Sequence, residues 1–485
     1  MCCSTKNTSQ TDQILIDLQV FENLLSRNRE LETLVARLKE EIKELKDRLS
    51  KNSRNSSKPP SSDGYTRPSP KSLRKKTGRK PGGQPGHKPA RLEPVSNPDR
   101  IIEHKPEICK YCKGKIDDST LEQTQKRQVF DVLPINFHVK EHQIFKGRCS
   151  CCGKETESEF PENVSAPTQY GPNIAATAVH LNIHHAMPVK RISGFFHDHL
   201  GDNAPSSGTI SSWLRRASKL AQPTIEEIRQ GLISSPVNHF DETGIRISGK
   251  TRWLHNVSNA EATLQTAHEK RGKEGILSSG VIEEFEGVAV HDCWGPYFSE
   301  YTGPHALCNA HILRELQFFA EKDSSSWTHN MIDFLHRAKD ASRAALEKNE
   351  SINEERLEEF SKEFAKIISA GLNSLPPPPE RKPGKRGRHA RGKERCLLER
   401  MREHEDSILR FLHDVTVPFD NNQAERDIRM AKVKMKVSGG FRSKSGAETY
   451  TTLRSYIETA RKQSHNVFKA IADLFRRKPF TPIFK

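Results

Sequence analysis

The chain has 485 residues, which at roughly 100–200 residues per domain predicts two to four folded units. Lys and Arg number 78 against 62 Asp and Glu, so the net charge is +16 and a polyanionic partner is indicated, with nucleic acid first. No apolar run approaches the ~18 residues of a membrane span, and the first residues lack the apolar stretch of a secretory signal. Composition therefore argues against membrane and secreted classes and predicts a cytoplasmic protein, in which the ten cysteines are metal ligands or free thiols rather than disulfides.

A heptad repeat marks the first predicted element, a coiled coil over residues 11–50. Val35 and Ile42 take a positions, and Asn28 is a lone polar a residue. The d positions hold leucines: Leu24, Leu31, Leu38 and Leu45. This pattern favours a parallel two-stranded coil and hence a homodimer. The alternative is an amphipathic helix packed on its own domain, since the repeat spans only about four heptads.

Residues 51–100 form the second segment, a predicted basic disordered linker. They are rich in Ser, Pro, Gly, Lys and Arg and nearly free of large apolar side chains, so no packed core can form. The run GRKPGGQPGHKP could lie in a DNA minor groove with its cations on the phosphates. An ordinary flexible linker explains the composition equally well.

Two CxxC pairs identify a small zinc-binding β unit over residues 101–165. Cys109 and Cys112 form the first pair and Cys149 and Cys152 the second, and four such thiolates can close a structural Zn²⁺ site. The sequence between them alternates like β-structure, which would return the second pair to the first. Cys151 leaves the ligand assignment open.

Residues 170–235 show helical periodicity and predict a helical region. MPVKRISGFFHDHLG and SSGTISSWLRRASKL read as two helices joined by a turn, the second with a Ser/Thr-rich start suited to an N-cap. This pair could be a helix-turn-helix DNA reader with Arg215 and Arg216 near phosphates. A plain helical hairpin is at least as common.

Residues 236–477 are predicted to form the last and largest domain. Short strand-like runs, VNHFDETGIRIS, KTRWLHNVSN, ATLQTAHEK and GVAVHDCWGPYF, indicate an α/β sheet and make the whole chain a multidomain α/β protein. Long helical stretches follow as an insertion, with a basic Pro/Gly-rich loop at about 376–395. A final helical block runs from about 421 to 477.

Two aspartates follow strand-like runs in this domain. Asp241 comes directly after VNHF and Asp292 directly after VAVH, so each is predicted to end a strand of one sheet. Neighbouring strands lie ~4.8 Å apart, and paired carboxylates at their ends could share a metal ion. One such aspartate alone is more often a turn former or helix cap, so the signal is the pair.

A third acidic element opens the final helical block. Glu425, Arg429 and Lys432 fall at i, i+4 and i+7 and therefore share one helical face. A carboxylate with cations one and two turns away can ligate a metal while the cations hold phosphates. Spacing alone would favour a solvated ion-pair face, and Asp420 or Asp427 could equally supply the third carboxylate.

The motifs together resemble the transposases of the insertion sequence 66 family over nearly the whole chain. The resemblance rests on the N-terminal coil, SSKPPSSD, GRKPGGQPGHKP, the two CxxC pairs, HFDETGIRI, HDCWGPYF, CNAHILREL and DNNQAERDIRMAKVKMKVSGGFRS. It implies an RNase H-like catalytic core with Asp241, Asp292 and Glu425 as a DDE triad holding two Mg²⁺ (or Mn²⁺) ions. The likeness, not the spacing, selects Glu425 over its acidic neighbours.

The resemblance also implies what the remaining residues do. His311 and Arg314, in CNAHILREL, are expected to contact DNA near the active site, and Arg429, Lys432 and Lys436 to neutralise phosphate charge as it builds. The expected activity is cleavage and strand transfer at insertion-sequence ends in nucleoid DNA. The expected partners are terminal inverted repeats, target DNA and companion proteins encoded in the same element.

Two other functions remain open on the sequence. One is a non-catalytic, zinc-containing coiled-coil regulator that binds DNA with structural acidic residues. The other is a related nuclease or resolvase, which would share the metals but yield no joined products. Divalent-metal dependence separates the regulator from the enzymes, and a strand-transfer assay separates the nuclease.

Overall fold

A five-stranded mixed sheet forms the centre of the molecule. The computed structural model describes residues 18–52, 55–56, 92–131, 135–322, 326–378 and 391–484. The strands of the sheet are β3 (Val237–Ile247), β4 (Lys250–Ser258), β5 (Thr263–His268), β6 (Val288–His291) and β7 (His305–Leu307). Their order is β5-β4-β3-β6-β7, which confirms the predicted mixed α/β class.

The central strand β3 pairs antiparallel with β4 and parallel with β6. Ser248 and Gly249 join β3 to β4, and both have positive φ, 49° and 76°, as a two-residue type I′ hairpin requires. β6 pairs parallel with β7, a strand of three residues that the sequence did not predict because so short a run carries no periodicity. Two short helices, α5 (Lys273–Leu277) and α6 (Gly295–Glu300), lie in the connections on either side of β6.

Helices from two distant parts of the chain share one hydrophobic core with β3, β4 and β5. They are α2 (Pro172–Val179), α3 (Val189–Leu200), α4 (Ser207–Ile233), α12 (Asn422–Ser438), α13 (Lys444–Lys462) and α14 (Val467–Phe475). The N-cap predicted for α4 is present, because the Ser206 side chain accepts a hydrogen bond from the Thr209 amide. The boundary expected near residue 236 therefore does not separate two cores.

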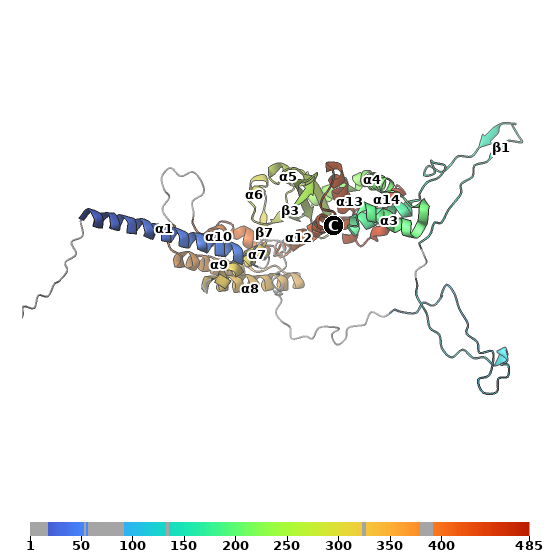
Figure 1. Cartoon of the computed structure of the whole chain (residues 1–485), viewed down its shortest axis with the longest axis horizontal. Coiled ribbons are helices and arrows are strands. Elements are labelled where there is room, and N and C mark those ends of the chain that lie inside the picture. The colour runs from blue at the N-terminus through green and yellow to red at the C-terminus, as the bar shows by residue number, and fades with distance from the viewer. Residues whose placement is uncertain are drawn as a thin grey trace, which may run out of the picture.

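A second hydrophobic core lies on the other face of β6 and belongs to the helices between β7 and α12. These are α7 (Asn309–Lys322), α8 (Ser326–Lys348), α9 (Glu354–Ser374), α10 (Lys393–Glu403) and α11 (Glu405–His413). Adjacent residues of a strand face opposite sides, and accordingly Ala289 is buried in the first core and Val290 in the second. Figure 1 shows β3 between these two groups of helices. Most of the basic loop predicted at 376–395 lies outside the described residues.

The N-terminal helix α1 (Leu18–Ser50) covers most of the segment predicted as a coiled coil. Its d-position leucines are about half exposed, from 47% at Leu38 to 57% at Leu24. The end of α1 contacts the insertion, where Lys322 of α7 forms an ion pair with Asp47 at 2.9 Å. The linker predicted at 51–100 lies largely outside the described residues.

The cysteine-rich region contains little regular structure. Its two strands, β1 (Lys146–Arg148) and β2 (Glu155–Glu157), form a short hairpin around the second CxxC pair. The alternation between the pairs, at residues 127–145, predicted strands that are absent from the described part of that segment, where nearly all side chains are exposed.

Among the helices that the structure describes, none has the length and apolar character needed to cross a bilayer.

Candidate functional site

Asp241 and Asp292 are brought to the same level of two neighbouring parallel strands. The last pair of the β3–β6 register joins His239 to Val290, and Asp241 and Asp292 each follow two residues later in the chain. Asp292 directly follows β6, as predicted. Asp241 lies in the middle of β3 rather than at its end, because β3 continues to pair with β4 after β6 has stopped.

The two aspartates are electrostatically linked. Burial raises the pKa of Asp241 well above its ordinary value, and the nearby charges of Glu242, Asp292 and Glu425 raise it further. Burial and then Glu242 raise the pKa of Asp292 to about 6, although Arg271 opposes that shift. Without a compensating cation, ionising both carboxyls together is unfavourable.

Glu242 is a fourth carboxylate at this site, and sequence reasoning missed it. Its side chain is 2% exposed and accepts hydrogen bonds from Arg271, at 2.6 Å and 2.9 Å, and from the Tyr297 hydroxyl, at 2.8 Å. The Arg271 guanidinium also lies over the ring of Trp294, 4.2 Å from its centroid. Because three donor groups already occupy Glu242, it acts as an anchor for Arg271 beside Asp292. The adjacency of Asp and Glu in HFDETG was the available signal.

Glu425 stands in the first turn of α12, which packs on β3 and β4. Its carboxylate faces two side chains of α7, with His311 Nε2 at 3.8 Å and Arg314 NH1 at 3.6 Å. Both distances are too long for hydrogen bonds, and the Arg314 contact is an ion pair. Burial and the Arg314 charge lower the pKa of His311, which favours its neutral ring. The structure therefore places these two residues, expected at DNA, directly beside Glu425.

The other acidic residues of the same segment are occupied elsewhere. Asp427 is buried and forms an ion pair with Lys462 at 2.9 Å, while Thr263 and Gln423 donate hydrogen bonds to it. Asp420 accepts the Asn422 amide at 3.1 Å. Of the three carboxylates left open by spacing, Glu425 is the one whose charge contributes to the raised pKa of Asp241.

The three cations of α12 that were predicted to neutralise phosphate charge have different surroundings. Lys432 is half-buried and donates a hydrogen bond to the Gly244 carbonyl at 3.3 Å. Burial lowers the pKa of Lys432, and the charge of Asp241 opposes this shift. Arg429 and Lys436 are exposed and make no hydrogen bond or ion pair with the described residues. Of these three side chains, Lys432 lies close to Asp241, and Arg429 and Lys436 face solvent.

The carboxylates of Asp241, Asp292 and Glu425 are of the donor type that suits a hard divalent cation, although their ligand atoms do not all lie within 4.8 Å of one another in this structure. Carboxylate oxygens are the ligands that Mg²⁺ and Mn²⁺ prefer. Asp292 Oδ1 is buried and has no hydrogen-bond partner among the described residues, which is costly unless a cation or water satisfies it. Ligand atoms of Cys308, His311 and Glu425 also lie within 4.8 Å of one another, but burial raises the pKa of Cys308 to about 12 and keeps it a thiol.

The two CxxC pairs adopt the same local turn. The amide of Cys109 donates to Gly114 O and that of Cys149 to Lys154 O, at 2.9 Å and 2.8 Å. Backbone N–H groups, first those of Cys112 and Cys152, lower the pKa of Cys109 and Cys149 respectively, which favours the ligating thiolate. The structure does not bring three of these thiols within 4.8 Å of one another in the described residues, and β1 lies on a separate arm in Figure 1.

Family models match three parts of the chain. A model described as "Transposase IS66 family" matches residues 167–449, more than half of the chain. A zinc-finger binding domain of transposase IS66 matches residues 106–153, and a family of unknown function matches residues 16–93. No curated protein matches the chain. The first match spans the sheet, the acidic residues and the helical insertion, and the chain therefore belongs to the IS66 family of transposases.

Proposed function

We propose that this transposase cuts and joins DNA strands at insertion-sequence ends through a DDE triad of Asp241, Asp292 and Glu425 on an RNase H-like core. The observation that carries the proposal is the β3–β6 register, which sets Asp241 level with Asp292. The strand order β5-β4-β3-β6-β7, with an antiparallel half and a parallel half, supports the fold assignment.

The proposed metals are two Mg²⁺ or Mn²⁺ ions held by the three carboxylates. When bound, such ions activate the attacking water and stabilise the leaving 3′ oxygen. The raised pKa values of Asp241 and Asp292 support this assignment, because positive charge between the two carboxyls would relieve their repulsion. The unpartnered Asp292 Oδ1 supplies a free lone pair for it.

The protein's own cations bind and orient the DNA. Arg429 and Lys436, exposed on α12, contact the phosphates that flank the scissile bond. Lys432 lies deeper and places positive charge beside Asp241, where negative charge builds on the phosphate. His311 and Arg314 orient Glu425 in the free protein and contact DNA once metal neutralises that carboxylate.

The remaining regions recognise the DNA and hold two chains together. The zinc finger, with Cys109, Cys112, Cys149 and Cys152 as ligands, and the basic residues around it bind terminal inverted repeats of nucleoid DNA. The exposed leucine stripe of α1 supports a homodimer formed by a parallel coiled coil. Companion proteins encoded in the same element join the complex.

The experiment uses a labelled DNA fragment that carries one insertion-sequence end, a target plasmid and Mg²⁺. Asp241→Asn removes a charge with little change of shape, so cleavage and strand-transfer products should fall by at least about 10³-fold while gel-shift binding persists. Asp198→Asn, at an exposed position on α3, is the matched control, because it removes one negative charge away from the proposed triad.

The outcomes separate the competing functions. Cleavage that survives in Asp241→Asn contradicts the triad. Binding without cleavage by the unchanged protein, with or without Mg²⁺ or Mn²⁺, would favour the regulator, and cut ends without joined products would favour a nuclease.

A further inference from the structure

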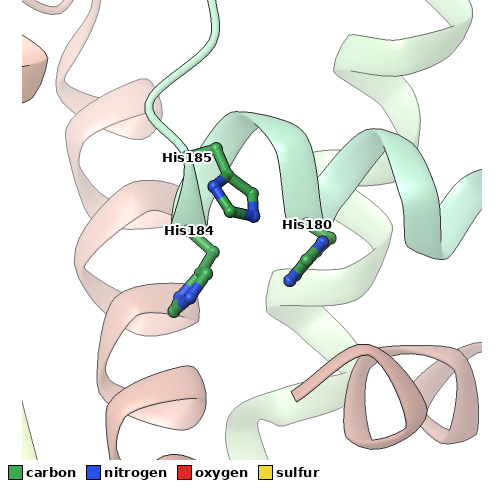
Figure 2. Close-up of side chains that lie close together, drawn as sticks. All are labelled: His180, His184 and His185. Atoms are coloured by element: carbon green, nitrogen blue, oxygen red, sulfur yellow. The ribbon is translucent and has the colours of Figure 1, made fainter. Parts of the chain in front are cut away.

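Three histidines crowd together at the end of α2, far along the chain from the acidic residues and the zinc finger. The rings of His180 and His184 are stacked with centroids 5.2 Å apart, and His185 meets both edge-on, at 4.7 Å and 5.0 Å. One nitrogen from each ring lies within 4.8 Å of the other two. Figure 2 shows the three side chains gathered on one side of the turn.

A π-helical turn over residues 180–184 creates this arrangement. In an α-helix residue i+5 points away from residue i, whereas a π-turn closes its hydrogen bond after five residues and brings i+4 and i+5 back beside i. The His185 amide accordingly donates to the His180 carbonyl at 3.3 Å. Ala186, which is buried, then takes φ of 57°, a left-handed conformation that is uncommon for residues with a side chain. Such turns and strained residues recur at functional sites.

The three imidazoles lack the partners that usually explain buried histidines. None of them makes a side-chain hydrogen bond to the described residues, and His184 Nδ1 is fully enclosed without a partner. Burial, with the neighbouring histidines, lowers the pKa of His180 to about 4, and burial also lowers the pKa of His184. Neutral imidazole is the form that ligates metals, and burial favours it at His180 and His184.

We propose that His180, His184 and His185 form a binding site for one transition-metal ion of the Zn²⁺ type. Three imidazoles without a carboxylate favour Zn²⁺, Ni²⁺, Co²⁺ or Cu²⁺ and disfavour Mg²⁺ and Ca²⁺, which need oxygen ligands. Three protein ligands leave at least one coordination position for water. The site is therefore open, whereas a zinc finger with four thiolate ligands is closed.

Charged side chains of α13 lie near the site, and some would repel a bound cation while another would attract it. Arg454 and Arg461 lie near His184, and they would repel a cation. Glu458 forms ion pairs with both, and its carboxylate offsets much of that repulsion. From α14, Phe468 supplies an aromatic wall 6.1 Å from the His180 ring centroid. The ligand set, rather than the field around it, determines the metal that binds.

All three ligands come from a single turn, so the ion would stabilise the conformation of that turn rather than cross-link two separate helices. The turn packs on α13 and α14, and Arg454 of α13 donates to the Ile183 carbonyl at 3.4 Å. A bound metal ion would therefore stabilise the turn at the place where it packs on α13 and α14. This inference does not depend on the chemistry proposed for the carboxylates.

The test measures zinc retained by the full-length, tag-free protein after loading with Zn²⁺ and dialysis against excess Mg²⁺. His185→Ala is the main variant, since His185 is exposed and its loss leaves no cavity. His184→Ala is the second variant, and His197→Ala, an exposed histidine on α3, is the control. Circular dichroism checks that each variant keeps its helical content.

We expect the unchanged protein and His197→Ala to retain about one more zinc ion per chain than His185→Ala and His184→Ala. The zinc finger contributes equally to all four proteins and cancels in the difference. With Co²⁺ in place of Zn²⁺, the difference spectrum should show visible d–d bands without thiolate charge-transfer absorption. Equal zinc retention in all four proteins would overturn the site and leave the cluster a packed aromatic group.

Discussion

Replacing Asp292 by Asn should make the metal-free protein more stable, because the native carboxyl is held in a place that disfavours its charge. The pKa of Asp292 is raised from its ordinary value of 3.8 to about 6 by burial and by Glu242. At pH 7.5 both the folded and the unfolded states are ionised, so the shift of about two units costs the folded state about 3 kcal/mol. This is an upper value, since Asp292 is partly exposed.

The sign of the pH dependence follows from linkage. The folded state binds the Asp292 proton more tightly, so its stability falls as pH rises from about 4 to about 6 and is level above that. The gain from Asp292→Asn should therefore be largest at pH 7.5 and about half as large at pH 5. The amide also loses the ability to bind a cation, so Mg²⁺ should stabilise the native protein more than the variant.

Thermal unfolding of the native protein and of Asp292→Asn, in EDTA and in about 10 mM Mg²⁺ and at about pH 5 and about pH 7.5, measures these differences in stability. Asp198→Asn, at an exposed position on α3, controls for the removal of one negative charge. The reasoning is refuted if Asp292→Asn melts below the native protein in EDTA, or if Mg²⁺ raises the melting temperature of both proteins equally.

Three further predictions test the assignments around the site. Lys462→Ala should destabilise the fold by about 3–5 kcal/mol in thermal unfolding, since it leaves Asp427 buried and unpaired; an unchanged melting temperature would contradict a structural role for Asp427. Cys152→Ser should lower the zinc content by about one ion per chain and Cys151→Ser should not, as measured by mass spectrometry of the metal; the reverse pattern would exchange the two as ligands. Leu38→Glu, at a d position, should convert a dimer to a monomer in light scattering, and a mass that does not change would exclude α1 as the dimer contact.

The sequence predicted the sheet and its acidic residues because both leave local signals. Short strand-like runs before Asp241 and Asp292 marked β3 and β6, and the helical spacing after Asn421 marked α12. The position of Asp241 within β3 was beyond local reasoning. A strand continues wherever it finds a partner, and the partner that extends β3 is β4.

Partnerships between distant residues were the part that sequence could not supply. Neither His311 nor Arg314 carries a local sign of facing Glu425, more than a hundred residues later in the chain. Glu242 was overlooked because its partner Arg271 lies in the connection between β5 and α5, far from β3 in the sequence. The histidine cluster was also missed, since i, i+4 and i+5 share a face only in a π-turn.

The helical insertion has a consequence for how this enzyme could be altered. Its first helix, α7, supplies both His311 and Arg314, which face Glu425, and the insertion packs on the sheet through the second core. A shortened chain without the insertion would keep every strand that carries an acidic residue, yet Glu425 would face open solvent. A mutation or a bound partner that loosens the insertion would therefore change the surroundings of the Glu425 carboxylate without touching the strands that carry Asp241 and Asp292.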